Sequence, residues 1–198
     1  FSFVKKAVVV GVVAGSWSAQ AGVPFTSIEG YGGAAFNPFA YTSGQNKEEG
    51  KEPLGGLSSK GQFGIWYVNL GDVDVDWTSL GGGLTLGGRL ELSGSHEIVA
   101  PNGKNLYKNN YGAKLNLVPE NLGGNNAIPA VSVGAVAKTI SDVAEGSDDD
   151  GYDFYGVATK LITQTPLPVL LSAGVLSTKA QVTGVFGFND DSDVVGFG

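Results

Sequence analysis

The chain has no cysteine, no methionine and only one histidine among its 198 residues. Without cysteine it can form no disulfide framework, no thiolate zinc site and no cysteine nucleophile. A single histidine also argues against a metal site built from a histidine cluster. We therefore expect a protein with neither a metal nor a cofactor.

Charge is scarce as well, since charged residues make up 16% of the chain. The 19 acidic residues outnumber the 12 basic ones and give a net charge of −7. Contact with phosphate groups needs a basic patch, so nucleic acid is not expected as a partner. The 32 glycines and the lack of helix-forming runs beyond the N-terminus favour an all-β protein.

No apolar run reaches the ~20 residues that a membrane-spanning helix requires. The most apolar stretch, residues 7–15, follows two lysines at 5–6 and precedes an A-x-A triplet at 19–21. A basic start, a short apolar run and such a triplet are typical of a secretory signal peptide. We predict a signal peptide over residues 1–21 that is cleaved before Gly22. The alternative is a buried strand or helix.

From residue 62 onward, apolar and polar residues alternate. Successive side chains of a strand point to opposite faces, so this period of two predicts strands with one apolar and one polar face. Residues 22–61 are predicted to be an irregular N-terminal segment, either a plug or a first strand, and residues 62–198 to be antiparallel strands. The predicted strands span residues 62–70, 73–79, 84–98, 108–118, 130–141, 152–163, 169–178 and 181–188, with another beginning at 194.

One cationic side chain recurs among the alternating residues of strand after strand: Arg89, Lys114, Lys138, Lys160 and Lys179. A charged face needs water, whereas an apolar face needs a core or lipid. A β-barrel in an outer membrane provides both, with lipid outside and a polar lumen inside. The predicted fold is therefore an antiparallel transmembrane β-barrel in the bacterial outer membrane. We predict that Arg89, Glu91, Lys114, Lys138 and Lys160 line its lumen.

These charges allow two interpretations of the lumen. In the first, they set the field inside a pore and bias the passage of anions or polar solutes. In the second, they pair across the lumen with Glu91, Glu97, Asp74 or Asp76 and fill a narrow barrel that conducts nothing. Narrow barrels are filled by side chains, and only wider ones leave a channel. The sequence leaves both open.

Aromatic residues near strand ends are expected at the two membrane interfaces. They include Trp66, Tyr67 and Trp77 on the first predicted hairpin, and the pairs Tyr107 and Tyr111, Tyr152 and Tyr155, and Phe186 and Phe188. The alternative is that they form the core of a soluble sandwich. A sandwich rarely places a lone cation in the middle of so many strands, which argues against that alternative.

The chain offers no catalytic constellation, and we predict that it is not an enzyme. His96 shares the parity of the apolar residues around it, while Ser93 and Ser95 point the other way, so no nearby serine completes a dyad. We expect an interfacial histidine. The acidic clusters at 72–76, 148–150 and 190–193 lack the spacing of an EF-hand calcium loop and are expected to be solvated.

Six runs of the sequence carry a resemblance to a known family: residues 22–41, 66–81, 109–121, 129–139, 151–163 and 165–191. They resemble an uncharacterised family of proteobacterial outer-membrane proteins, a porin-like domain of unknown function. The resemblance implies an outer-membrane barrel but no specific activity. Members of the family look longer and continue with further strands, so we expect this chain to be a fragment of a larger barrel.

The function that these observations favour is a porin-like passive channel for small solutes with a charged lumen. One alternative is a non-conducting structural or adhesive outer-membrane barrel. Another is a secreted soluble β-protein that binds a ligand. The expected partners are the lipid bilayer, lipopolysaccharide, the outer-membrane assembly machinery and small solutes.

Overall fold

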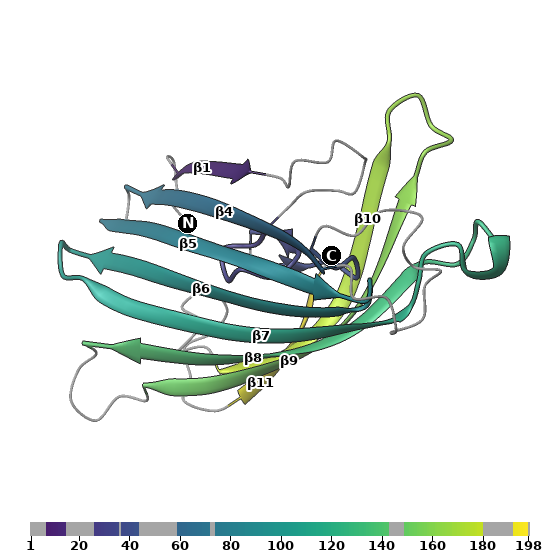
Figure 1. Cartoon of the computed structure of the whole chain (residues 1–198). Helices are drawn as coiled ribbons and strands as arrows, with labels where there is room; N and C mark the ends of the chain where they lie inside the picture. The colour runs from purple at the N-terminus through teal and green to yellow at the C-terminus, as the bar shows by residue number, and fades with distance from the viewer. Residues whose placement is uncertain are drawn as a thin grey trace.

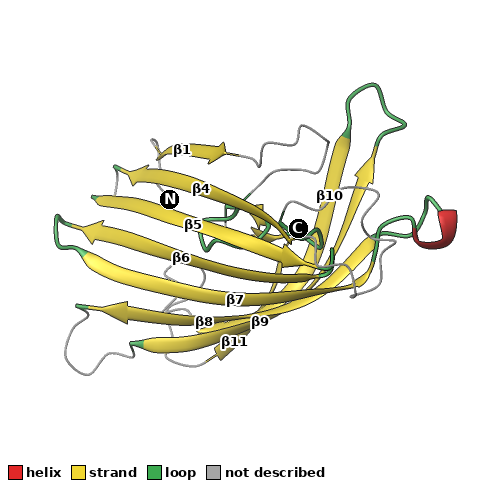
Figure 2. Cartoon of the chain, in the orientation of Figure 1, coloured by secondary structure: helices red, strands yellow, loops and turns green. Residues whose placement is uncertain are grey.

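The computed structural model describes residues 7–14, 26–35, 37–43, 59–71, 74–142, 149–179 and 192–197. Within these residues the regular secondary structure consists of strands and one turn of 3-10 helix, η2 (Leu122–Gly124), which lies in a loop between two strands (Figure 2). In this part of the chain no helix is long and apolar enough to cross a membrane. The predicted all-β fold is confirmed, while the predicted strand over 181–188 lies outside the described residues.

Nine strands form one antiparallel sheet that curls into part of a barrel (Figure 1). From β4 onward each strand pairs with the next along the chain, so the sheet is a simple meander. A short hairpin of β2 and β3 lies within the curl. The strands are β1 (Ala7–Ala14), β2 (Gly33–Ala34), β3 (Asn37–Pro38), β4 (Ser59–Leu70), β5 (Val75–Leu86), β6 (Leu90–Pro101), β7 (Leu106–Val118), β8 (Ala130–Ser141), β9 (Asp150–Ile162), β10 (Val169–Lys179) and β11 (Ser192–Phe197).

Strand β1 comes from the region predicted to be a signal peptide. It pairs antiparallel with β4, with Ala7 opposite Leu70 and Ala14 opposite Phe63. It lies at the edge of the sheet, so its removal would leave the register of the other eight strands unchanged. Cleavage of residues 1–21 stays a prediction.

The structure corrects the gap predicted between the strands over 73–79 and 84–98, which contains the glycines of residues 81–83. β5 runs through them without interruption, and the chain turns instead at residues 87–89. Gly87 and Gly88 have φ angles of 54° and 65° there, a left-handed conformation that glycine adopts at little cost. The single strand predicted over 84–98 is therefore the end of β5, a turn and β6, and Arg89 lies in the turn.

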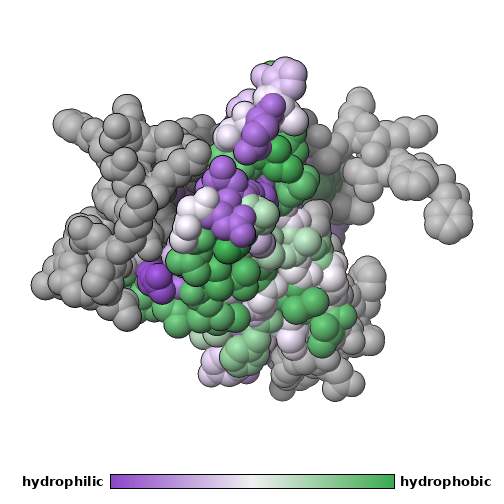
Figure 3. Space-filling model, turned by 90° about the vertical axis from the view of Figure 1, so that its right-hand side faces the viewer, coloured by the Kyte–Doolittle hydropathy of each residue, from purple (hydrophilic) through white to green (hydrophobic). Residues whose placement is uncertain are grey.

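The sheet buries its polar face and exposes its apolar face, the reverse of the arrangement in a soluble protein. The concave face buries charged and polar side chains, including Glu91, Glu97, Lys108, Lys114 and Lys138. The convex face exposes large apolar side chains, and one view of the molecule shows such residues gathered on its surface (Figure 3). They include Phe63, Ile65, Leu80, Leu84, Leu92, Tyr111, Leu115, Leu117, Val133, Phe154, Leu171 and Val175.

The predicted faces are correct on β7 and β8 and reversed on β9. Lys114 and Lys138 are buried on the concave face, on the parity that the sequence predicts. On β9 that face carries Tyr155 and Val157, which are buried, whereas Lys160 has the opposite parity. Tyr155 and Val157 thus pack inward, whereas Phe154 of the same strand is exposed on the convex face.

Tyr155 explains this reversal. Its ring lies 5.7 Å from that of Tyr31, measured between centroids. It also lies directly across from Gly134 on β8, where a Cβ atom would overlap the ring. The glycine leaves room for a large aromatic residue on the concave side, and Tyr31 covers it.

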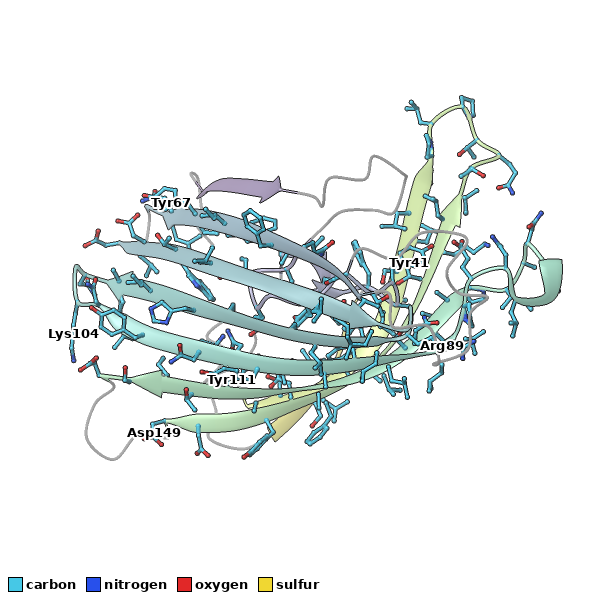
Figure 4. All side chains as sticks on the ribbon, viewed as in Figure 1. Tyr41, Tyr67, Arg89, Lys104, Tyr111 and Asp149 are labelled. Carbon is cyan, nitrogen blue, oxygen red and sulfur yellow. The ribbon has the colours of Figure 1, made fainter. Side chains whose placement is uncertain are left out.

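The aromatic residues of the first hairpin also divide differently from the prediction. Trp77 is buried on the concave face, and Trp66 donates its indole N–H to the carbonyl oxygen of Thr26 at 2.8 Å. Tyr67 and Tyr111 remain exposed on the convex face, Tyr67 near one end of the sheet (Figure 4). Both tryptophans are therefore part of the interior.

Candidate functional site

Residues 26–35 and 37–43, here called the inner segment, lie against the concave face of the sheet (Figure 1). The described pairings within this segment are the β2–β3 hairpin and an isolated bridge between Thr26 and Gly32. Most of its buried backbone groups therefore need partners other than a strand ladder. Four backbone hydrogen bonds within the segment, among them Ile28 N–H to Ala35 and Phe39 N–H to Gly32, provide some of these partners. Side chains of the concave face provide others.

An ion pair holds the backbone of Gly32 from both sides. Glu91 on β6 and Lys114 on β7 are direct cross-strand partners, with a carboxylate oxygen 3.2 Å from the ammonium nitrogen. The N–H of Gly32 donates to Glu91 at 3.0 Å, and Lys114 donates to the carbonyl oxygen of Gly32 at 3.0 Å. Glu91 also accepts from the N–H of Ser43 at 2.5 Å. This pair acts as a clamp on two points of the inner segment.

A second group of side chains binds the backbone of Ala40. Thr159 accepts from the N–H of Ala40 at 2.8 Å, while Asn116 and Ser132 donate to its carbonyl oxygen at 3.0 and 2.5 Å. These side chains come from β9, β7 and β8. Ala40 itself is fully buried, so these side chains take the place of water as hydrogen-bond partners of its N–H and carbonyl groups.

Polar side chains of β5 hold the two ends of the inner segment. Ser79 donates to the carbonyl oxygen of Ile28 at 2.5 Å, and Thr85 donates to that of Ser43 at 2.6 Å. Irregular backbone is buried without a large cost only where protein groups or water satisfy its donors and acceptors. The polar alternation of the strands provides that environment for the inner segment.

Glu29 lies at the centre of a chain of buried charges. One of its carboxylate oxygens accepts from Lys108 at 3.0 Å and from Lys138 at 2.5 Å, and the other accepts from the hydroxyl of Tyr31 at 3.0 Å. Lys138 also contacts Asp153 at 2.5 Å, and Lys108 lies 3.7 Å from Glu97. Two ammonium groups thus alternate with three carboxylates.

The electrostatic environment keeps Glu29 ionised. Burial by itself raises the pKa of this carboxyl, but the charges of Lys138 and Lys108 outweigh it and lower the pKa to about 2. Burial and the negative charge of Glu29 raise the pKa of Tyr31 well above its usual value. Tyr31 therefore remains a hydroxyl donor to Glu29 at neutral pH.

Small residues let the inner segment approach the sheet closely. Gly30 has a φ of 91°, and a Cβ on it would overlap the backbone of Gly94 on β6. A Cβ on Gly81 of β5 would lie 2.9 Å from the Cα of Gly30. Two of the three glycines at which the sequence predicts a break, Gly81 and Gly83, therefore lie against the inner segment.

Of the five residues predicted to line the lumen, the structure brings three onto the concave face: Glu91, Lys114 and Lys138. Arg89 lies in the β5–β6 turn, at the end of the sheet opposite Lys104 (Figure 4). Lys160 lies at the rim, where it contacts Glu120 at 3.0 Å and donates to Asn121 at 2.6 Å. The side chain of Lys179 is outside the described residues.

Asp74 and Asp76 of the first hairpin are exposed and do not pair with the buried cations. Asp76 is exposed on the convex face, where it accepts from Tyr67 at 2.6 Å and from Asn69 at 2.7 Å. His96 is exposed on that face too, hydrogen-bonded to Asn109 at 2.8 Å and stacked on Tyr107. Neither residue belongs to the charged interior.

Sequence reasoning missed the residues at the centre of the network. Lys108 shares the parity of Asn110 and Lys114, so the alternation of β7 could have identified it. Asp153 lies on the same face of β9 as Tyr155, and the alternation of the sequence predicts that face to be the apolar one. Glu29 carries no such signal, because the irregular inner segment has no strand periodicity and its lysine partners are 79 and 109 residues away.

Among the described residues, no group of three or more histidine, cysteine or acidic side chains is arranged to hold a metal ion. The chemistry that this arrangement supports is recognition, since its buried donors and acceptors bind backbone and carboxylate groups.

Comparison with known proteins adds a family but no activity. No curated protein matches the chain, and no solved structure does. Residues 21–195 match a family described as protein of unknown function, DUF3034, and this range covers the inner segment and the sheet from β4 to residue 195 in β11, but not β1. The chain therefore belongs to the DUF3034 family, whose members are proteins of unknown function.

Proposed function

We propose that this protein is an outer-membrane β-barrel whose convex apolar face contacts lipid. The observation that carries the proposal is the inverted burial of the sheet. Buried lysines and glutamates on one face, with exposed leucines, valines and aromatic residues on the other, would be unfavourable for a soluble protein, because exposed apolar area costs ~25 cal/mol per Å² in water. Contact with lipid removes that cost.

Within such a barrel, we propose a porin-like passive channel for small solutes that the inner segment holds closed. The contacts across the concave face support this, because side chains rather than a strand ladder hold the inner segment. Without that segment, the concave face would present Lys108, Lys114 and Lys138 to water. Single-channel recording of the full chain in planar bilayers tests the proposal.

A non-conducting structural barrel is the second candidate. It is supported by the ion pairs of the buried lysines, each of which has a carboxylate partner in the described region. A folded barrel that inserts into bilayers and shows no openings, even when the inner segment is released, would favour this candidate. In either case we propose that the protein is not an enzyme and that lipid, lipopolysaccharide and the assembly machinery are its partners.

Export through a cleaved signal peptide is part of the proposal. We expect protein purified from the outer membrane to begin at Gly22, because the A-x-A triplet ends at residue 21. Mass spectrometry of the intact mature chain measures this directly. A mature protein that retains residues 7–14, and with them β1, would contradict the prediction.

Substitution on the convex face should separate a membrane barrel from a soluble one. Leu92→Arg on β6 is expected to weaken folding into liposomes by roughly 2–4 kcal/mol, the cost of arginine near the bilayer midplane. Leu122→Arg in the loop bearing η2 is the matched control, because the two leucines are similarly exposed, at 45% and 49%. Folded fractions are read from heat-modifiable gel mobility. Equal tolerance of both variants would contradict contact of β6 with lipid.

A further inference from the structure

We propose that Lys108 and Lys138 form a binding site for the carboxylate of a small organic anion, and that Glu29 occupies this site while the inner segment is in place. The inference rests on the proposed channel and names the substrate class of its lumen. Glu29 is then an internal competitor of the solute, and solute binding favours displacement of the inner segment.

The geometry around Glu29 is that of a bound carboxylate. The two lysines come from adjacent strands, β7 and β8, where Lys138 lies directly across from Asn110. Both ammonium groups bind the same oxygen of Glu29, and the second oxygen accepts from Tyr31. Both lysines are almost fully buried, so this contact is shielded from salt and water.

The lysines belong to the sheet, whereas the carboxylate between them does not. Glu29 comes from a segment that is held by side-chain contacts and can leave without breaking a pairing of the β4–β11 sheet. Its departure leaves Lys138 with Asp153 and Lys108 with Glu97. Each ammonium group then lacks one of its anionic contacts, and a free carboxylate restores it.

The neighbouring charges limit which anions fit. Glu97 and Asp153 flank the two lysines, so the sheet part of the site holds two positive and two negative charges. A monoanion adds one negative charge, as Glu29 does, whereas a phosphate dianion adds two, and a doubly charged ion costs more free energy to desolvate in a buried site. The site therefore favours a single carboxylate over a dianion.

The surface beside the lysines is apolar. Val136, Tyr155 and Val157 belong to one buried cluster with Tyr31, and the first three remain on the sheet when the inner segment leaves. Their apolar surface can be buried against the organic part of a ligand. A short monocarboxylate with an apolar or aromatic body, such as benzoate, matches both features.

The test uses Glu29→Ala in the full chain, which removes the internal carboxylate, with Glu29→Gln as a second variant that keeps the side-chain volume. Binding of carboxyl-labelled benzoate to refolded protein is followed by NMR, and benzamide serves as the neutral ligand of the same shape. We expect both variants to bind benzoate and not benzamide. Addition of Lys138→Gln or Lys108→Gln should weaken benzoate binding by about tenfold or more. Lys104→Gln, the same change in an exposed turn, should leave it unaltered.

Single-channel recording of the Glu29→Ala protein separates the two proposals. Benzoate binding without conductance would sustain the site and contradict the channel. Conductance with equal affinity for benzoate and benzamide, or with tighter binding of inorganic phosphate, would overturn the site and leave the channel standing. Binding that persists in both lysine variants would also overturn it.

Discussion

Replacement of Glu91 by leucine should detach the inner segment and lower the free energy of unfolding by about 3–5 kcal/mol, as expected when one partner of a buried ion pair is removed. The change leaves the Lys114 ammonium buried without its carboxylate partner, and it removes the acceptor of the Gly32 and Ser43 N–H groups. Urea unfolding of the refolded protein in liposomes measures the loss. Limited proteolysis within residues 26–43 reports detachment.

Two further variants define what the Glu91 result means. In the double variant Glu91→Leu/Lys114→Leu no charge is left unpaired, so part of the stability should return. Glu120→Leu at the rim, where the carboxylate is only partly buried, should cost far less. A Glu91→Leu protein as stable and as protease-resistant as the wild type would contradict the clamp on the inner segment.

A disulfide between the inner segment and β5 should hold the proposed channel shut. A Cβ on Gly83 would lie 3.2 Å from the Cβ of Ser43, and disulfides join Cβ atoms about 3.5–4.5 Å apart. Ser43→Cys/Gly83→Cys thus needs a shift of only a few tenths of an ångström. The chain has no other cysteine, so this is the only bridge that can form within it.

We expect openings of the double-cysteine protein in planar bilayers under reducing conditions and their near-complete loss after oxidation. The two single-cysteine variants, treated identically, are the controls. Gel mobility with and without reductant verifies the bridge. Conductance that is unchanged after the disulfide forms would show that the inner segment does not close the pore. Silence in both redox states would favour the structural barrel.

The strand content and most strand positions were predictable because they depend on local geometry. Side chains alternate between faces in any strand, so the residues around Lys114 and Lys138 indicated both the strands and their polar face. The all-β fold followed from the same alternation. Membership of an uncharacterised family was also visible in the sequence, since the resembling runs fall within the matched residues 21–195, while the outer-membrane, porin-like nature of that family stays a prediction.

Predictions failed where a residue's role depends on what approaches it in space. The glycines of residues 81–83 indicate a turn by composition, but they lie within β5, where Gly30 packs against Gly81 and Ser43 against Gly83. Tyr155 was expected outside, yet it faces inward because Gly134 makes room for it and Tyr31 covers it. A glycine permits a turn or a close contact, and only the neighbours decide which.

The sequence by itself determined that strands with one polar and one apolar face would form, and that Glu91, Lys114 and Lys138 would share a face. Only the tertiary structure decided what that face binds. The partners of these charges include an irregular segment with no periodicity, joined to them across 48 to 109 residues of chain. Such pairing follows from the curvature of the sheet and the burial of unpaired backbone and charge, which no local pattern encodes.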